Sequence, residues 1–271
     1  MATEIMSALE RIWPMDRYGR LVNRADTGPM PEELLELCHD MTDTALRRFE
    51  NRLHSIYLTG EAAWDWPAPA LFRIVLRDDS LRRPDMDFGG LQALQVRAGH
   101  VLSHPVEVRV HGWSEVRDML SAPTRLQMRL ATSSRCIAGP DLTLDLVPPE
   151  PDGRAARALI ADYTALIERI ASQAPRIVNE ARLKRLSRHA AHRTLETLFA
   201  LIMDKEGVYT ECPSVMAGFA AMHWPQRRHS IASCERVARD GVSLSLELSS
   251  FIDHHTGWVR SEVGRRLTRV S

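Results

Sequence analysis

Short apolar runs alternate with amphipathic stretches over the first half of the chain. Four of the runs are apolar and β-prone and end near glycine or proline, and they therefore predict strands. The predicted strands cover residues 55–59, 71–76, 105–110 and 135–139. Around them, apolar residues recur every three or four positions and predict helices. These helices cover residues 31–53, 89–99, 114–120 and 124–132.

The second half of the chain predicts helices only. Three prolines and a glycine over 148–153 can continue neither a helix nor a central strand, so they mark a domain boundary. Gly257 predicts a break in the last helix. The expected helices cover residues 156–170, 177–204, 213–222, 229–239 and 242–267.

The fold class expected from this order is α+β, a small mixed sheet in the N-terminal half followed by an all-α helical bundle. Residues 1–30 are expected to form an arm that starts with a short helix over 2–12 and wraps the domain. A mixed α/β domain over 31–147 and a helical bundle over 154–271 complete the predicted organisation.

Composition excludes several classes of protein. The 271 residues carry 35 basic and 35 acidic side chains, so overall charge does not indicate a nucleic-acid coat or a membrane-surface protein. The four cysteines lack the paired spacing of a zinc site or a disulfide framework. No apolar run approaches the roughly 18 residues of a membrane span, and the first twenty residues contain no leader-like run. We therefore expect a cytoplasmic protein with no membrane partner.

The order of elements resembles the nucleotidyltransferase superfamily, which includes DNA polymerase beta and the small aminoglycoside nucleotidyltransferases. The first strand ends in Gly60, the third carries Glu107 at its centre, and the short fourth strand closes with Gly-Pro-Asp-Leu over 139–142. The resemblance covers residues 31–146. The helical half resembles the bundle that often follows such a domain.

The resemblance implies magnesium chemistry on a nucleoside triphosphate. In-line attack on a phosphoryl group uses two magnesium ions clamped between phosphate oxygens and protein carboxylates. The family pattern places a Gly-Ser after the first strand to cradle phosphate. It also places two aspartates, one residue apart, on the second strand and a third acid on the third strand. Alternation along the second strand puts both aspartates on one face of the sheet.

This chain departs from that pattern at the catalytic positions. Glu61 follows Gly60 where the family has serine, and the two aspartate positions hold Leu71 and Arg73. An aliphatic side chain cannot bind magnesium, and a guanidinium repels it. Only Glu107 matches an acidic position, where it is the candidate metal ligand. The first hypothesis is therefore a catalytically degenerate protein that binds a nucleotide-like or small phosphorylated ligand, or a protein partner.

A second hypothesis keeps the enzyme active with relocated carboxylates. Glu107 would then hold magnesium together with Asp65, in the loop after the first strand, or Asp78, after the second strand. Such an enzyme would move an NMP group to a small hydroxylated acceptor. The alternative interpretation of Asp78 is a solvated turn residue.

Aromatic and basic residues supply further candidates for ligand binding. Trp64 lies beside Gly60 and would either stack on a base or plug the cleft. Lys184 and Arg188 are one helical turn apart on a basic helix, as a phosphate clamp requires. The alternative for this pair is a solvated helix face paired with nearby acids.

The same basic helix carries a third hypothesis. Arg182 precedes His189, and Arg185 precedes His192, each with six residues between, which resembles the Arg-to-His spacing of HEPN-type RNases. Histidine would act as general base or acid on a ribose hydroxyl, and arginine would stabilise the phosphorane. Chance also produces this spacing in a chain with eleven histidines.

Overall fold

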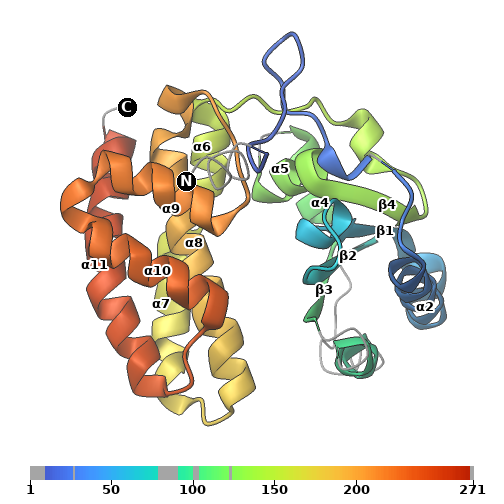
Figure 1. The fold of residues 1–271 in the computed structure, drawn as a ribbon. Helices are drawn as coiled ribbons and strands as arrows, with labels where there is room; N and C mark the ends of the chain where they lie inside the picture. The colour runs from blue at the N-terminus through green and yellow to red at the C-terminus, as the bar shows by residue number, and fades with distance from the viewer. Residues whose placement is uncertain (1–9, 27, 79–90, 100–103, 122–123, 269–271) are drawn as a thin grey trace. The chain divides into compact units, whose positions relative to one another are not determined.

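The computed structural model describes residues 10–26, 28–78, 91–99, 104–121 and 124–268, which form two compact units (Figure 1). The sheet unit is Pro14–Glu150. The helical unit combines the chain up to Trp13 with the chain from Pro151 onward. Within the described residues, no helix is both long enough and apolar enough to cross a membrane.

A four-stranded mixed sheet forms the centre of the sheet unit. Its strands are β1 (Leu53–Thr59), β2 (Ala70–Leu76), β3 (Val106–His111) and β4 (Ser134–Ala138). Their order in the sheet is β3-β2-β1-β4. β1 is antiparallel to β2 and β4, whereas β2 and β3 are parallel. A parallel pair needs a long crossover connection, and the helix over 91–99 lies in that connection.

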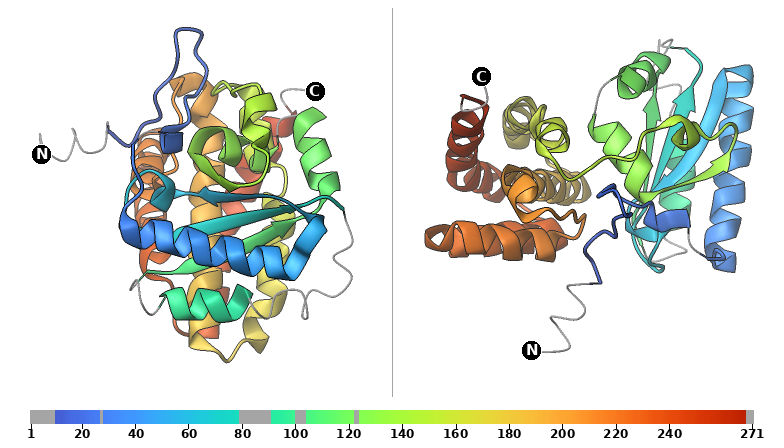
Figure 2. Two further views of the ribbon diagram at one scale, coloured as in Figure 1. Left: turned by 90° about the vertical axis from the view of Figure 1, so that its right-hand side faces the viewer. Right: turned by 90° about the horizontal axis from the view of Figure 1, so that it is seen from above.

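Helices lie on both faces of this sheet. One face packs against the helix over 91–99 and against α2, which runs along the sheet in Figure 2. The other face packs against α4, α5 and η4 around Tyr57 and Val75. Besides the helix over 91–99, the helical elements of this unit are η1 (Arg24–Asp26), α2 (Glu32–Phe49), η2 (Glu50–Arg52), η3 (Glu61–Ala63), α4 (Trp113–Ser121), α5 (Arg125–Ser133) and η4 (Leu142–Asp145).

Gly139 fixes the end of β4 against β1. Its φ is +80°, a conformation that side chains of L-residues rarely adopt. A Cβ at this position would lie 2.1 Å from the carbonyl oxygen of His54 and 2.9 Å from the Cα of Ser55. Both neighbours are backbone atoms of β1, so they cannot rotate away. The close approach of the two strands therefore requires glycine.

The helical unit is built around α8, which packs against five other helices of the unit. Most α8 residues from Ala190 to Met203 are buried, so the second half of this helix is covered by its neighbours on nearly every side. The elements are α6 (Gly153–Ile160), α7 (Tyr163–Gln173), η5 (Ala174–Arg176), α8 (Glu180–Glu206), α9 (Pro213–His223), η6 (Pro225–Arg227), α10 (Arg228–Asp240) and α11 (Ser245–Thr268).

The predicted break at Gly257 is wrong, because α11 continues through it. A glycine inside a helix costs only about 1 kcal/mol relative to alanine, and packing of the neighbouring residues outweighs that cost. Val259 and Thr256, on either side, are both buried.

The beginning of the described chain belongs to the helical unit. Trp13 is 2% exposed, its amide donates to the carbonyl of Tyr209 at 2.8 Å, and the two rings meet edge to face. Thr210 Oγ1 donates to the carbonyl of Arg11 at 2.8 Å. Of the helix predicted over 2–12, residues 2–9 lie outside the described residues, and residues 10–12 form a turn.

A buried ion pair lies inside the helical unit. Arg193 on α8 is fully buried and forms ion pairs with Glu196, which is 1% exposed, and with Asp162 at the start of α7. Its Nη1 also donates to the carbonyl of Leu159 at 3.1 Å. One guanidinium thus joins α8 to the end of α6 and the start of α7.

Candidate functional site

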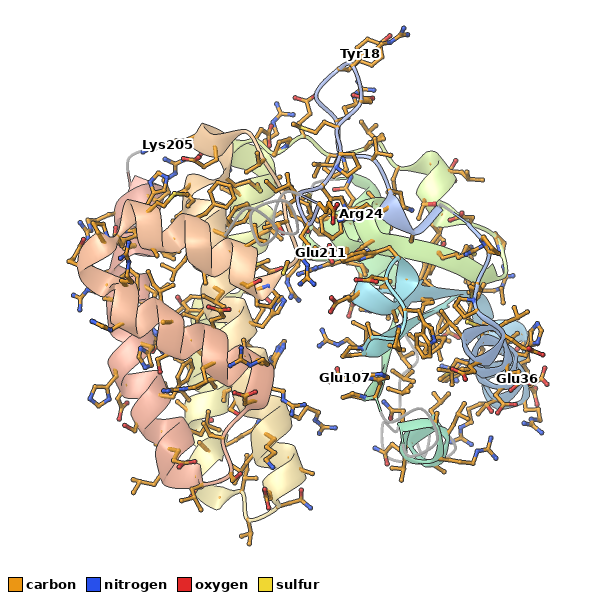
Figure 3. The ribbon with its side chains drawn as sticks, viewed as in Figure 1. Tyr18, Arg24, Glu36, Glu107, Lys205 and Glu211 are labelled. Carbon is orange, nitrogen blue, oxygen red and sulfur yellow. The ribbon has the colours of Figure 1, made fainter. Side chains whose placement is uncertain are left out.

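The three positions at which the family pattern has acids lie together on one face of the sheet. Leu71 on β2 pairs in register with Glu107 on β3, and Arg73 pairs with Arg109. Because side chains alternate along a strand, Leu71 and Arg73 share the face of Val75, which is the α4 and α5 face. Glu107 lies on the opposite side of the sheet from α2, which carries Glu36 (Figure 3).

Arg73 occupies the centre of this face and is 5% exposed. Its Nη1 lies 3.1 Å from Nε2 of His111, the last residue of β3. A guanidinium only donates, so Nε2 accepts and the imidazole proton is on Nδ1. Nδ1 lies 2.5 Å from Oε2 of Glu115 on α4 and donates to it. The chain Arg73, His111, Glu115 therefore connects the sheet to α4 and fixes a neutral imidazole.

The pKa of His111 lies below its usual value of 6.5, chiefly because burial disfavours the charged imidazolium. Glu115 opposes this shift, while the positive charges of Arg73 and Arg109 add to it. Protonation of Nε2 would also place a donor against the donor of Arg73. The site is thus built around uncharged histidine.

This histidine predicts a loss of stability in acid. Its pKa is lower in the folded chain than in the unfolded chain, so unfolded molecules bind the proton first. The stability that neutral His111 contributes is complete above pH 6.5 and is lost as pH falls from there toward the folded-state pKa. Urea unfolding gives the free energy of unfolding at pH 7.5 and at pH 5.5. We expect this free energy to fall less between the two pH values in His111→Gln than in the wild type. An equal loss in both would contradict this assignment.

Glu107 and Arg109 form the accessible part of the face. Their side chains are 39% and 35% exposed, and Oε2 of Glu107 lies 3.7 Å from Nη2 of Arg109. An ion pair this exposed and this long contributes little stability. Either side chain can therefore leave this ion pair and contact a ligand instead.

The turn after β1 does not present its first amide to a ligand. Gly60 has φ +81°, and its N–H donates to the carbonyl of Ser133 at 3.1 Å. Glu61 then starts the short helix η3 with an exposed side chain. The positive φ suits glycine, but the Gly60 amide, which the expected phosphate cradle would need, already donates to a backbone carbonyl of the sheet unit.

The two relocated carboxylates lie in different places. Asp65 is exposed in the turn that follows η3. Asp78 lies two residues beyond the end of β2, whereas Leu71, the register partner of Glu107, lies near the start of that strand. The strand from Leu71 to Leu76 alone spans about 17 Å. The side chain of Asp78 forms an ion pair with Arg52 at 3.2 Å. Asp78 and Glu107 therefore do not share a cation, and the pair of Asp65 with Glu107 stays a prediction.

Trp64 already has a cation on its ring. The Arg24 guanidinium lies 4.2 Å from the ring centroid, in cation–π geometry. Trp66, two residues later, packs against the core cluster of α2 and contacts the ring of His104 edge to face. Because Arg24 covers one face of the Trp64 ring, the arrangement favours the interpretation that Trp64 fills the cleft over the interpretation that it stacks on a base.

The expected phosphate clamp on α8 makes contacts within the helical unit. Lys184 forms an ion pair with Glu180 at 2.7 Å, and Arg188 donates to the carbonyl of Asp240 at 3.4 Å. Gly241 approaches so closely that a Cβ there would lie 2.9 Å from the oxygen of Lys184. The residues of the RNase hypothesis also lie on α8, with Arg182 and Arg185 exposed and His189 and His192 half-buried. That hypothesis stays untested.

Sequence reasoning missed Arg109, His111 and Glu115. A signal for the last two was present, because a histidine at the end of a predicted strand stands four residues before a glutamate in the next helix. Within the described residues, no group of three or more histidine, cysteine, aspartate or glutamate side chains is arranged to hold a metal ion.

No protein-family model matches the chain, and neither does any curated protein sequence. Among solved structures, it is similar to the crystal structure of a spectinomycin adenyltransferase from Enterococcus faecialis with ATP and spectinomycin. The sequences are 13% identical, the TM-score is 0.48, and the match covers 83% of this chain and 98% of that chain. The chain's own small mixed sheet and following helical unit give the α+β architecture that the nucleotidyltransferase resemblance predicts.

Proposed function

We propose that this protein is a nucleotidyltransferase-fold protein that has lost magnesium-dependent transfer and binds a nucleotide-like, phosphate-bearing ligand on the sheet face of Glu107 and Arg109. The observation that carries this proposal is the position of Arg73. Its guanidinium lies on β2 beside Arg109, on the face where the family pattern has its metal-binding acids.

Electrostatics favour an anion over a magnesium ion beside Arg73. A guanidinium stays charged at every physiological pH and presents only donors. At 5 Å and an effective dielectric constant of 20, it repels a cation by roughly 3 kcal/mol per unit of ion charge. The same charges attract a phosphate, which Arg109 can bind with its planar fork once it leaves Glu107. Arg73 and Arg109 thus supply the positive charge that magnesium supplies in the family pattern.

Calorimetric titration with ATP, GTP, CTP and UTP, each with and without magnesium, tests the proposal. We expect at least one nucleotide to bind with an affinity that magnesium does not increase. Arg109→Gln should weaken that binding about tenfold, which corresponds to the roughly 1.4 kcal/mol of one charge-assisted contact. The matched control is Arg117→Gln on α4, where the replaced side chain is also exposed.

The alternatives give different outcomes in the same experiments. Magnesium-dependent transfer of a nucleotidyl group to any acceptor, abolished by Glu107→Gln and by Asp65→Asn, would overturn the proposal and establish the active enzyme. Absence of nucleotide binding would also overturn it, and a protein partner would become the leading hypothesis. RNA cleavage lost in His189→Ala or His192→Ala would favour the RNase.

A further inference from the structure

Glu107 and Arg109 lie two residues apart on β3 and share one face of the sheet. In the described sheet, β3 is the last strand and pairs with β2 alone. About 7 Å of strand separates the two backbone positions, yet Oε2 of Glu107 and Nη2 of Arg109 lie 3.7 Å apart. The two side chains therefore converge, and they place a carboxylate acceptor beside a group that only donates.

The neighbouring residues on β2 give this pair an orientation. Leu71 is the register partner of Glu107, and Arg73 is the register partner of Arg109. Because Arg73 is 5% exposed, it affects a ligand mainly through its charge. The Arg109 end of the pair is thus the positive end, and the Glu107 end borders a partly buried aliphatic side chain. An anionic group fits at Arg109, and an uncharged part of the same molecule fits beside Glu107 and Leu71.

A phosphate at Arg109 changes the surroundings of Glu107. A phosphomonoester carries about 1.5 to 2 negative charges at neutral pH and three acceptor oxygens, so it competes with the single carboxylate for the guanidinium. The displaced carboxylate then lies beside the phosphate, and the repulsion between the like charges opposes binding. A hydrogen-bond donor on the ligand next to the phosphate offsets this cost, because it donates to the carboxylate.

We infer that Glu107 selects ligands in which a hydroxyl lies on the carbon next to the phosphorylated carbon, as in a ribonucleoside 2′- or 3′-monophosphate. The inference rests on the proposed function, because that proposal places the phosphate at Arg109. Oxygens on neighbouring carbons lie little more than a hydrogen-bond length apart, which matches the 3.7 Å between the two side chains. Glu107 accepts from the hydroxyl, in place of the metal-binding role that the family pattern gives to its position.

Calorimetric titration of the full chain with the 3′-monophosphates of adenosine, guanosine, cytidine and uridine, and with their 2′-deoxy counterparts, tests the inference. We expect at least one ribonucleotide to bind about fivefold more tightly than its deoxy counterpart, as one hydrogen bond to a partly exposed carboxylate predicts. The two ligands of each pair share their phosphate and base, so the comparison isolates the hydroxyl.

Glu107→Ala assigns the preference to this side chain. We expect the fivefold preference to disappear, because the acceptor is gone. The deoxyribonucleotide should bind the variant at least as tightly as it binds the wild type, because no carboxylate then competes for Arg109. The Glu107 side chain is 39% exposed, so the variant should keep the wild-type melting temperature. The matched control is Glu36→Ala on α2, which removes an exposed carboxylate on the other side of the sheet and should keep the preference (Figure 3).

The outcomes separate this inference from the proposed function. Equal binding of the two ligands by the wild type, or the same preference in the wild type and in Glu107→Ala, would overturn the inference. The proposed function would still stand if Arg109→Gln weakened nucleotide binding. Binding of nucleoside 5′-triphosphates without binding of any 3′-monophosphate would also overturn the inference alone. Absence of all nucleotide binding would overturn the proposed function and the inference with it.

Discussion

Replacing Arg193 with alanine is expected to lower the free energy of unfolding of the helical unit by about 3 to 5 kcal/mol. The buried carboxylate of Glu196 would lose its guanidinium, and the carbonyl of Leu159 would lose a donor. Urea unfolding measures the loss, and hydrogen exchange of the α8 amides assigns it to this unit.

The control replaces both members of the buried pair by apolar residues of similar size. The double variant Arg193→Met, Glu196→Leu removes both charges together, and such exchanges are often neutral or stabilising. We expect it to recover most of the stability lost in the single variant. A single variant as stable as the wild type would show that the ion pair contributes little, despite its complete burial.

Replacing Gly139 with alanine is expected to destabilise the sheet unit by about 2 to 5 kcal/mol. The positive φ costs roughly 1 to 2 kcal/mol for an L-residue, and forced overpacking adds about 1 to 3 kcal/mol. The added methyl group would meet the backbone of His54, so relief requires β1 and β4 to separate. Thermal unfolding followed by circular dichroism measures the effect.

Gly218→Ala is the matched control for this substitution. Gly218 lies inside α9, and among the described residues no atom outside the neighbouring backbone of α9 lies within 4 Å of the Cβ that would be added. Alanine there should stabilise the helix by up to about 1 kcal/mol, because it has the higher helix propensity. Destabilisation of similar size in both variants would show that the close approach at Gly139 is not the cause.

Periodicity predicted the elements well where burial and pattern agree. The four predicted strands all form, within one or two residues of their expected ends, because each is a short apolar run with a clear stop. The long last helix was divided at Gly257, because propensity is a weak guide where both flanks are packed. Strand order and pairing were beyond the sequence pattern, since they depend on contacts between distant segments.

In the candidate site, too, the sequence predicted positions along the chain but not contacts between distant segments. The sequence placed Leu71, Arg73 and Glu107 at the positions that matter in the family pattern, and register brings these three together. It did not reveal that Arg73 binds His111, because that contact joins the middle of β2 to the end of β3. Nor did it reveal that Asp78 pairs with Arg52, which lies in η2 before β1.

The anchoring of Trp13 beside Tyr209 has a consequence for how the chain matures during synthesis. The sheet unit is a continuous stretch inserted between two pieces of the helical unit. Because domains fold as units while the chain leaves the ribosome, the sheet unit can fold first. The early segment around Trp13 must meanwhile wait, with its apolar ring exposed, until about two hundred further residues have been made. During that interval the segment around Trp13 is an apolar surface to which a chaperone could bind.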